Sequence, residues 1–278
     1  MALVKGMAPG RAARWAILLV VGAVFAIPIV AMIEFSLRGP SRTTHDLRHW
    51  AALVAPAEAD QYAPVWQGLT ASLELVVVTV VLVLVLLTPT LILVRLRFPR
   101  LVRVLEFVCL LPITIPAIVL VVGLAPVYLV IGRAVGPESW TLAFAYGVLV
   151  LPFAYRAIAA NLDAIDARTL AEAARSLGAS WPRVLFTVLV PNLRVGLLAA
   201  ALISAAAVLG EFTIASLLNR VNLQTALFVI SQQDPFVAVI LALLALLFGF
   251  LLLTVLGRIG GARPVATAPA PRRNRVPA

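Results

Sequence analysis

Four carboxylates lie in or beside apolar stretches of the sequence, where an ionised side chain needs a partner or water: Glu34, Glu74, Glu106 and Glu211. The first three fall near the ends of their stretches, so we expect them to reach interfacial water. Glu211 lies deeper, and an ionised acid at the centre of a membrane helix costs on the order of 2.5–3.5 kcal/mol. We therefore expect Glu211 to line a wet translocation path. In that position Glu211 would attract a cationic solute. The alternative is that Glu211 only packs against neighbouring helices or gates the path, without contacting the solute.

Residues suited to metal, redox or nucleotide chemistry are few. His45 and His49 are four residues apart, a spacing that could hold a metal on a helix, but no third ligand is evident. Cys109 is the single cysteine, which excludes an intrachain disulfide and a cysteine zinc site. The single lysine, Lys5, does not lie in a phosphate-binding Gly-x4-Gly-Lys-Ser/Thr sequence. Without this sequence the chain cannot hydrolyse ATP by the P-loop route, so an ion gradient or another subunit must supply the energy for any transport. We predict no catalytic residue, metal or cofactor.

The segment 162–191 carries the most informative pattern. Asp166 is suited to cap a helix, and good helix formers follow it. Gly178 is suited to the C′ position, where a positive φ reverses the chain. Ser180 can cap a second helix, and Pro191 marks the entry to the next apolar stretch. The pattern predicts two short helices joined at a fixed turn.

The first of these helices is expected to be amphipathic. At helical spacing one face holds its apolar residues: Leu170, Ala173, Ala174 and Leu177. The polar side holds its charged residues: Arg168, Glu172 and Arg175. Such a helix could simply lie along a membrane with its charges solvated.

The spacing within the segment resembles the EAA loop of ATP-binding-cassette (ABC) importer permeases. The family pattern is Glu-Ala-Ala, three residues, Gly, nine residues, then Ile-x-Leu-Pro. Its positions are occupied here by Glu172, Ala173, Ala174, Gly178 and Pro191, with Val188 for Ile and Val190 for Leu. The resemblance extends from about Gly68 to Gly257, a five-helix core preceded by one extra helix.

This resemblance implies a non-catalytic permease subunit whose loop docks into a groove on a separate ATPase dimer. Ala173 and Ala174 would allow close approach, Glu172 would meet a basic residue of the groove, and Gly178 would hold the angle between the two helices. It also implies a second permease, identical or different, an extracytoplasmic solute-binding protein and the lipid bilayer as partners, and no nucleic acid. An ion-coupled secondary transporter is the alternative, but the paired inverted halves common in such carriers are not evident.

The solute is less well defined. The stretch Leu209–Leu218, followed by Thr225-Ala-Leu and Asp234-Pro-Phe, looks most like permeases for spermidine and putrescine. Permeases for iron, thiamine and phosphonate are close behind. The resemblance implies that specificity lies largely in the binding protein, so a polyamine is the expected solute with these three as alternatives.

Composition and apolar runs predict the fold that positions these residues. Of 278 residues 63% are hydrophobic and 12% charged, about half the usual charge of a soluble domain. Six apolar runs are long enough to span a membrane: Trp15–Ile33, Leu69–Val94, Val104–Ile131, Trp140–Ala160, Leu193–Leu218 and Phe236–Leu256. Prolines in the third run predict a kink or a short re-entrant turn. The runs predict an all-α polytopic membrane protein with six transmembrane helices, and the resemblance implies the type I ABC importer permease fold.

Basic residues set the expected orientation. Of the 22 basic residues, 17 fall at the two termini and in the segments after the second and fourth spans. The positive-inside bias then puts both termini in the cytoplasm. The resemblance to ABC importer permeases implies that this membrane is the inner membrane of a bacterial cell. We expect residues 1–67 to hold the N-terminal tail, first span and external loop, 68–257 the permease domain, and 258–278 a disordered basic tail.

Overall fold

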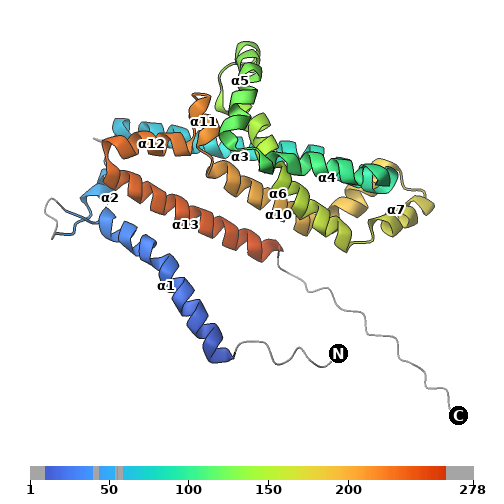
Figure 1. Cartoon of the computed structure of the whole chain (residues 1–278), viewed down its shortest axis with the longest axis horizontal. Helices are drawn as coiled ribbons and strands as arrows, with labels where there is room; N and C mark the ends of the chain where they lie inside the picture. The colour runs from blue at the N-terminus through green and yellow to red at the C-terminus, as the bar shows by residue number, and fades with distance from the viewer. Residues whose placement is uncertain (1–9, 40–43, 54, 56–58, 261–278) are drawn as a thin grey trace.

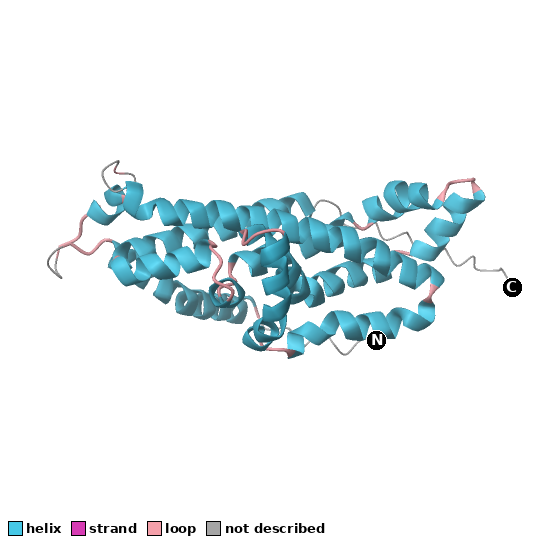
Figure 2. Ribbon diagram, turned by 90° about the horizontal axis from the view of Figure 1, so that it is seen from above, coloured by secondary structure: helices cyan, strands magenta, loops and turns pink. Residues whose placement is uncertain are grey.

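The computed structural model describes residues 10–39, 44–53, 55 and 59–260. Nearly all of this part of the chain is helical (Figure 2), and within it the only β-pairing is an isolated bridge between Arg38 and His45. The α-helices are α1 (Arg11–Ser36), α2 (Arg48–Ala52), α3 (Ala59–Arg97), α4 (Val102–Leu110), α5 (Ala117–Ala134), α6 (Ala143–Ala164), α7 (Ala167–Ser176), α8 (Trp181–Arg183), α9 (Val190–Asn192), α10 (Arg194–Leu209), α11 (Thr213–Leu217), α12 (Leu223–Gln233) and α13 (Pro235–Gly260). Short 3-10 helices are η2 (Pro99–Leu101), η3 (Leu111–Thr114) and η4 (Ser139–Leu142), and η5 (Val184–Leu189) is a π-helix.

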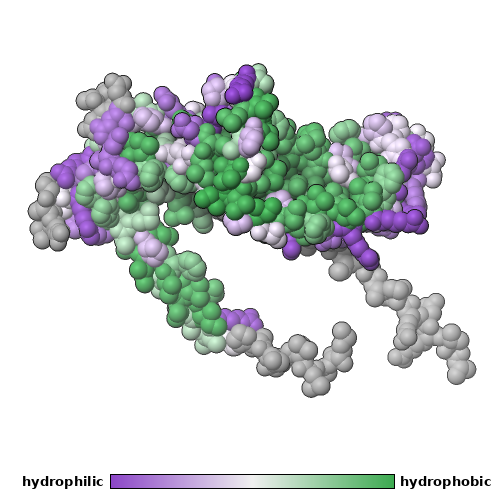
Figure 3. All heavy atoms as spheres, turned by 45° about the horizontal axis from the view of Figure 1, so that its top comes forward, coloured by the Kyte–Doolittle hydropathy of each residue, from purple (hydrophilic) through white to green (hydrophobic). Residues whose placement is uncertain are grey.

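α3, α6 and α10 lie side by side along one axis of the molecule with α13 beside them, whereas α1 runs obliquely away from the bundle (Figure 1). α7 lies at one end of the bundle, and α2 with the adjoining ends of α12 and α13 lies at the other. We call these the α7 end and the α2 end. α5 projects away from the bundle. Apolar residues cover the middle of the bundle, and hydrophilic residues gather towards its two ends (Figure 3). This distribution is the one that a bilayer around the middle of the bundle requires.

Four of the helical segments are long and apolar enough to cross a membrane: Arg11–Ser36, Gln61–Arg97, Ala117–Ala134 and Ser139–Ala164. A fifth candidate is the pair Trp181–Asn192 and Arg194–Leu209, which is bent by 73°. α13 counts only as a shorter apolar helix over Pro235–Leu251. The all-helical membrane fold is confirmed with four to five candidate spans in the described residues, and the number six remains a prediction.

Two of the predicted spans are interrupted. The third is divided into α4, η3 and α5, with Ile115 in an extended conformation between Pro112 and Pro116. Proline cannot donate a backbone hydrogen bond, so the break falls where the sequence placed a kink or turn. The fifth was predicted as one helix over Leu193–Leu218, which is wrong, because α10 ends at Leu209 and α11 begins at Thr213.

α6 lies at the centre of the core. Its buried residues pack against α3 and α10, and close contact depends on glycine. A Cβ on Gly196 of α10 would lie 2.5 Å from the Asn161 Cβ of α6, and a Cβ on Gly68 of α3 would lie 2.7 Å from the Ala226 Cβ of α12. Small residues at such crossings allow the backbones of membrane helices to approach each other.

Two helices extend beyond the boundaries of the predicted segments. α3 begins at Ala59, ten residues before the expected span, and its first turns bury Tyr62 and Val65 against Ile230 and Val237. The segment that was predicted to be external therefore contributes to a small core. At the other terminus α13 continues to Gly260, so the first residues assigned to the tail are helical, and residues 261–278 lie outside the described part of the chain.

Candidate functional site

α7 begins with the cap that the sequence predicts. The Asp166 side chain accepts a hydrogen bond from the Thr169 backbone N–H at 3.1 Å and another from the Thr169 hydroxyl at 2.7 Å. These bonds favour the ionised carboxylate, the Thr169 hydroxyl most, and they lower the pKa of Asp166 below its usual value. The start of the helix is thus specified locally.

The end of α7 confirms the predicted turn at Gly178, whose φ is +83°. The Gly178 N–H donates to the Arg175 carbonyl at 2.9 Å, and the Ala179 N–H donates to the Ala174 carbonyl at 3.1 Å. This pair of bonds is the Schellman arrangement, which needs a left-handed residue at C′. Glycine adopts that conformation without steric cost, so the turn follows from the sequence.

The faces of α7 differ from the prediction. Ala167 and Ala171 are buried towards η5 and the core, and Leu170 and Ala174 are half-buried beside them. The opposite side exposes three residues of the predicted coupling set and its surroundings: Glu172, Ala173 and Leu177. Leu177 is 90% exposed. Placing Ala173 and Leu177 on one face with Ala174 was therefore wrong, and Ala174 contacts the permease itself.

Glu172 is held on the exposed side by an ion pair. Its carboxylate lies 2.9 Å from the Arg168 Nε, one turn earlier, and both side chains are largely solvated. The pair raises the pKa of Arg168. Exposed pairs at this spacing contribute little to stability, so Glu172 is free to exchange Arg168 for another cation.

The second half of the segment is only partly as predicted. Ser180 is the N-cap residue of α8, but its side chain makes no capping hydrogen bond. α8 continues through η5 into α9, and the chain then bends by 73° into α10. Pro191 lies in α9, two residues before Leu193, where the bend occurs. The bend into α10 therefore lies two residues beyond Pro191, which was expected to mark the entry to this apolar stretch.

An aromatic contact connects this segment to the rest of the bundle. The Arg97 guanidinium, at the end of α3, lies 5.0 Å from the centroid of the Trp181 ring, and the Arg175 guanidinium lies 5.8 Å from it. Arg95 of α3 also forms an ion pair with Asp163 at the end of α6. The α7 end is therefore rich in arginine, and Trp181 joins α8 to both α3 and α7. Trp181 carries no local sequence signal for this function, because its two arginine partners are distant in the chain or lie across the turn at Gly178.

Glu211 lies in the break between α10 and α11 and is 8% exposed. Its two carboxylate oxygens accept from the Ile214 N–H at 3.1 and 2.9 Å, so the side chain caps the first turn of α11. It is not among the residues that line the two cavities described below. The geometry gives Glu211 a capping function, and its expected place in a translocation path remains a prediction.

Two cavities lie beside this break, separated by Phe212 and Phe228. The first has a volume of about 300 Å³ and the second about 460 Å³. Both are lined by Phe212 and Phe228, whose ring centroids are 5.4 Å apart. The polar side chains of the first cavity come from α3, α11, the following loop and α12: Gln67, Ser216, Asn219, Arg220 and Thr225.

The remaining acidic residues lie elsewhere. Glu34 pairs with Arg38 at 2.9 Å, and Glu106 of α4 is exposed. Glu74 is exposed fifteen residues after the start of α3, so it is not close to a helix end as predicted. It lies seven residues after Gln67, which places it on nearly the same face about 10 Å further along the helix.

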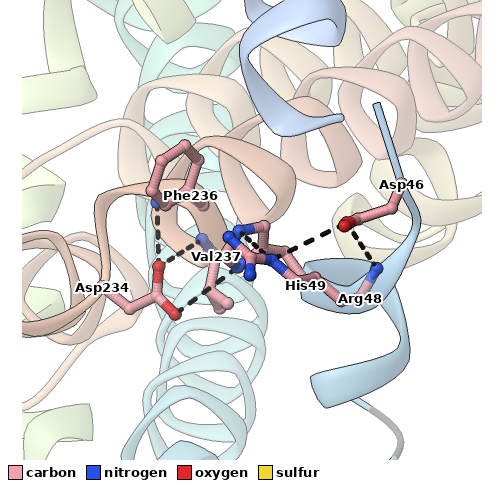
Figure 4. Close-up of polar contacts among 6 residues, drawn as sticks. All are labelled: Asp46, Arg48, His49, Asp234, Phe236 and Val237. Carbon is pink, nitrogen blue, oxygen red and sulfur yellow. Dashed lines mark hydrogen bonds and ion pairs between the residues drawn. The ribbon is translucent and has the colours of Figure 1, made fainter. Parts of the chain in front are cut away.

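The two histidines do not share a helix. His45 precedes α2 and lies 3.7 Å from Glu34, whereas His49 is in α2 with its Nδ1 4.0 Å from the Asp234 carboxylate (Figure 4). Asp234 also caps α13 by accepting from the N–H groups of Phe236 and Val237. Within the described residues there is no group of three or more side chains suited to bind a metal ion.

Comparison with known proteins identifies the family of this chain. Residues 90–261 match a family model described as the inner membrane component of binding-protein-dependent transport systems. No curated protein gives a significant match. The matched region contains α7 with its capped ends, the break at Glu211 and most of both cavities. Because it covers more than half of the chain, the chain belongs to the family of binding-protein-dependent transport inner membrane components, the non-catalytic, multi-pass permease subunits of ABC importers.

Proposed function

We propose that this permease couples to its ATPase through the exposed side of α7, and that the coupling surface is formed by Glu172, Ala173 and Leu177. Membership in the family implies an ATPase and a binding protein as partners in an ABC system. The observation that carries the proposal is the 90% exposure of Leu177 at the polar α7 end of the molecule. Leu177 adds an apolar contact beside Glu172 and Ala173 of the EAA pattern, so the exposed side of α7 offers a partner both a charged and an apolar group.

The geometry of α7 supports a rigid connection rather than a flexible one. Asp166 and Gly178 fix the two ends of the helix, and Ala167 and Ala171 hold its inner side against the core. Trp181 connects the next helix to the end of α3. A displacement imposed on α7 would therefore be passed to the spans through packed side chains. Alternating access driven by a separate subunit requires such a rigid connection, because the movement of the ATPase must reach the membrane-spanning helices.

The orientation proposed for the chain follows from the arginines. Arg95, Arg97 and Arg175 all lie at the α7 end, together with the EAA pattern. Positive residues accumulate on the cytoplasmic side of membrane proteins. We place the α7 end in the cytoplasm, where an ATPase can reach it, and the α2 end outside, where a binding protein can. A second permease, the same chain or another, completes the transport path.

The solute remains the least supported part of the proposal. The resemblance of Leu209–Leu218 to spermidine and putrescine permeases supports a polyamine, with iron, thiamine and phosphonate as alternatives. The cavity linings add no support for a polycation, because no Asp or Glu is among the residues that line them. The carboxylate of Glu211, which caps α11, already accepts a hydrogen bond from the Ile214 N–H.

Charge reversal on the exposed side of α7 tests the proposed coupling. Glu172→Lys should leave the protein in the membrane but weaken its association with the ATPase and abolish solute uptake. Gly178→Asp should act likewise by disturbing the turn. Arg183→Glu, in α8 and outside the proposed surface, is the matched charge-reversal control. ATPase association and uptake equal to those of the unmodified chain in both variants would refute the assignment of this surface.

A further inference from the structure

The first cavity has one charged residue in its lining, and that residue is basic. Arg220 faces a space of about 300 Å³ together with neutral polar side chains and the rings of Phe212 and Phe228. This volume is at the lower end of the range for small-molecule sites, which usually combine an apolar wall with a few polar groups. The lining therefore has the composition of a binding site for a small solute with one charged group.

Arg220 has no anionic partner within the described residues. No ion pair or side-chain hydrogen bond is formed by its guanidinium there, and its Nε is buried without an acceptor. Its Nη2 lies beside α5, where a Cβ on Gly132 would come within 3.5 Å. A guanidinium has five donors and stays charged, so a buried donor without an acceptor is costly. An anion in the cavity would supply acceptors for the guanidinium, which has none among the described residues.

The backbone holds Arg220 in place before any ligand binds. Asn219 has a φ of +51° and ends α11, with the Arg220 N–H donating to the Ala215 carbonyl at 2.8 Å. Asn222, two residues after Arg220, begins α12 with a capping box that includes Thr225. The Asn222 amide also donates to the Glu211 carbonyl at 2.8 Å. Arg220 thus lies in the short loop between α11 and α12, and hydrogen bonds fix both ends of that loop.

We propose that this cavity binds the anionic group of a small organic solute, a carboxylate, phosphonate or sulfonate, with Arg220 as the charged partner. Phe212 and Phe228 contact the apolar remainder of the solute. A guanidinium suits this task because its planar donors can bond two oxygens of one anion. The claim that the bound anion is cargo rests on the proposed function, whereas the anion site itself does not.

The same arrangement disfavours a polyamine at this position. A cationic solute would be repelled by Arg220 and would find no carboxylate in the lining. On α3, Glu74 is exposed about 10 Å beyond Gln67 and outside the lining. Variants of Arg220 and Glu74 therefore separate an anion bound in the cavity from a cation bound outside it.

Binding can be measured on the full-length chain, purified in phospholipid-free detergent with whatever subunits accompany it. The probes are phenylphosphonate, benzoate, inorganic phosphate and spermidine, titrated by calorimetry. We expect saturable binding of the organic anions, weakened about tenfold or more in Arg220→Gln because a charge-assisted hydrogen bond is lost. Arg133→Gln removes an exposed arginine at the nearby end of α5 and should bind as the unmodified chain does.

Several results would overturn the proposal. Equal anion binding by Arg220→Gln and the unmodified chain would remove Arg220 from the site. Binding of spermidine alone, lost in Glu74→Gln and kept in Arg220→Gln, would assign the opposite charge to the solute. If Arg220→Gln does not fold, Arg220→Lys decides, because loss of the planar donors should still weaken anion binding, and unchanged affinity refutes the site.

A lipid headgroup could supply the same anionic chemistry, so the titration is repeated in nanodiscs. With phosphatidylcholine alone or with added phosphatidylglycerol, we expect the soluble anions to bind equally. Loss of their binding only when phosphatidylglycerol is present would identify the occupant as a lipid and overturn the cargo assignment. None of these measurements needs the ATPase. Failure of the α7 coupling surface and failure of the anion site are therefore separate results.

Discussion

Leu177 should contribute a large share of the affinity of this permease for its ATPase. The side chain is 90% exposed on α7, between the ion-paired Glu172 and the Gly178 turn. Within the permease, the Leu177 side chain is therefore almost entirely without apolar contacts. If the ATPase groove buries it, the hydrophobic contribution arises on binding and not on folding.

The size of the effect follows from the number of buried carbons. Leu177→Ala removes three carbons, each contributing about 0.8 kcal/mol when buried, so the loss is about 2 kcal/mol for a side chain that is almost fully available. This corresponds to roughly 30-fold weaker association. The same change should leave the stability of the free permease nearly constant, since the side chain contacts little within it.

The assay is a titration of the purified ATPase onto the permease in nanodiscs, with thermal unfolding of each variant as the control for folding. Leu177→Met, which conserves volume, should change the affinity much less. Leu247→Ala removes a half-exposed leucine from α13, outside the proposed coupling surface, and should bind the ATPase like the unmodified chain. The reasoning is refuted if Leu177→Ala folds normally and binds the ATPase within about twofold of the unmodified chain.

Other features give further predictions. The lowered pKa of Asp166 means that its cap stabilises α7 above the unfolded-state pKa and that this stabilisation is lost as the pH falls through the folded-state pKa. The protection factors of the α7 amides, which correct hydrogen exchange for its intrinsic pH dependence, should therefore fall in acid. Asp166→Asn keeps the cap without a titrating group, so its protection factors should not change over the same pH range. Gly178→Ala should cost about 1–2 kcal/mol because φ is +83°, with Gly178→Asn milder, as measured by exchange at the end of α7. Gly196→Val should prevent stable folding in thermal unfolding assays, because its Cβ would lie 2.5 Å from that of Asn161, whereas Gly22→Ala, with open space around it, should not.

Local signals in the sequence predicted the parts of the site that depend on neighbouring residues. The cap at Asp166 and the turn at Gly178 need only residues within one helix turn, and both are confirmed. The apolar runs likewise predicted an all-helical membrane fold, because their length and composition are themselves the property that a bilayer selects. Family membership is confirmed through the matched residues 90–261.

Features that depend on distant contacts were predicted less well. Ala173 and Ala174 are adjacent in sequence, yet Ala173 is exposed and Ala174 is half-buried, because η5 packs against only one side of α7. The carboxylate of Glu211 caps α11 because the helix is interrupted there, which the sequence did not predict, and its place in a translocation path remains a prediction. Arg220 carried no local signal at all, since the cavity that it faces is assembled from α3, α11 and α12.

The sequence by itself determined that the chain is a helical membrane protein and determined where α7 starts and stops, because hydropathy and capping act over a few residues. Only the tertiary structure decided which side of α7 is free to bind a partner and which charge faces the cavity. Those properties depend on how α3, α6, α10 and α12 pack, and small residues such as Gly68 and Gly196 set that packing through contacts between residues far apart in the chain.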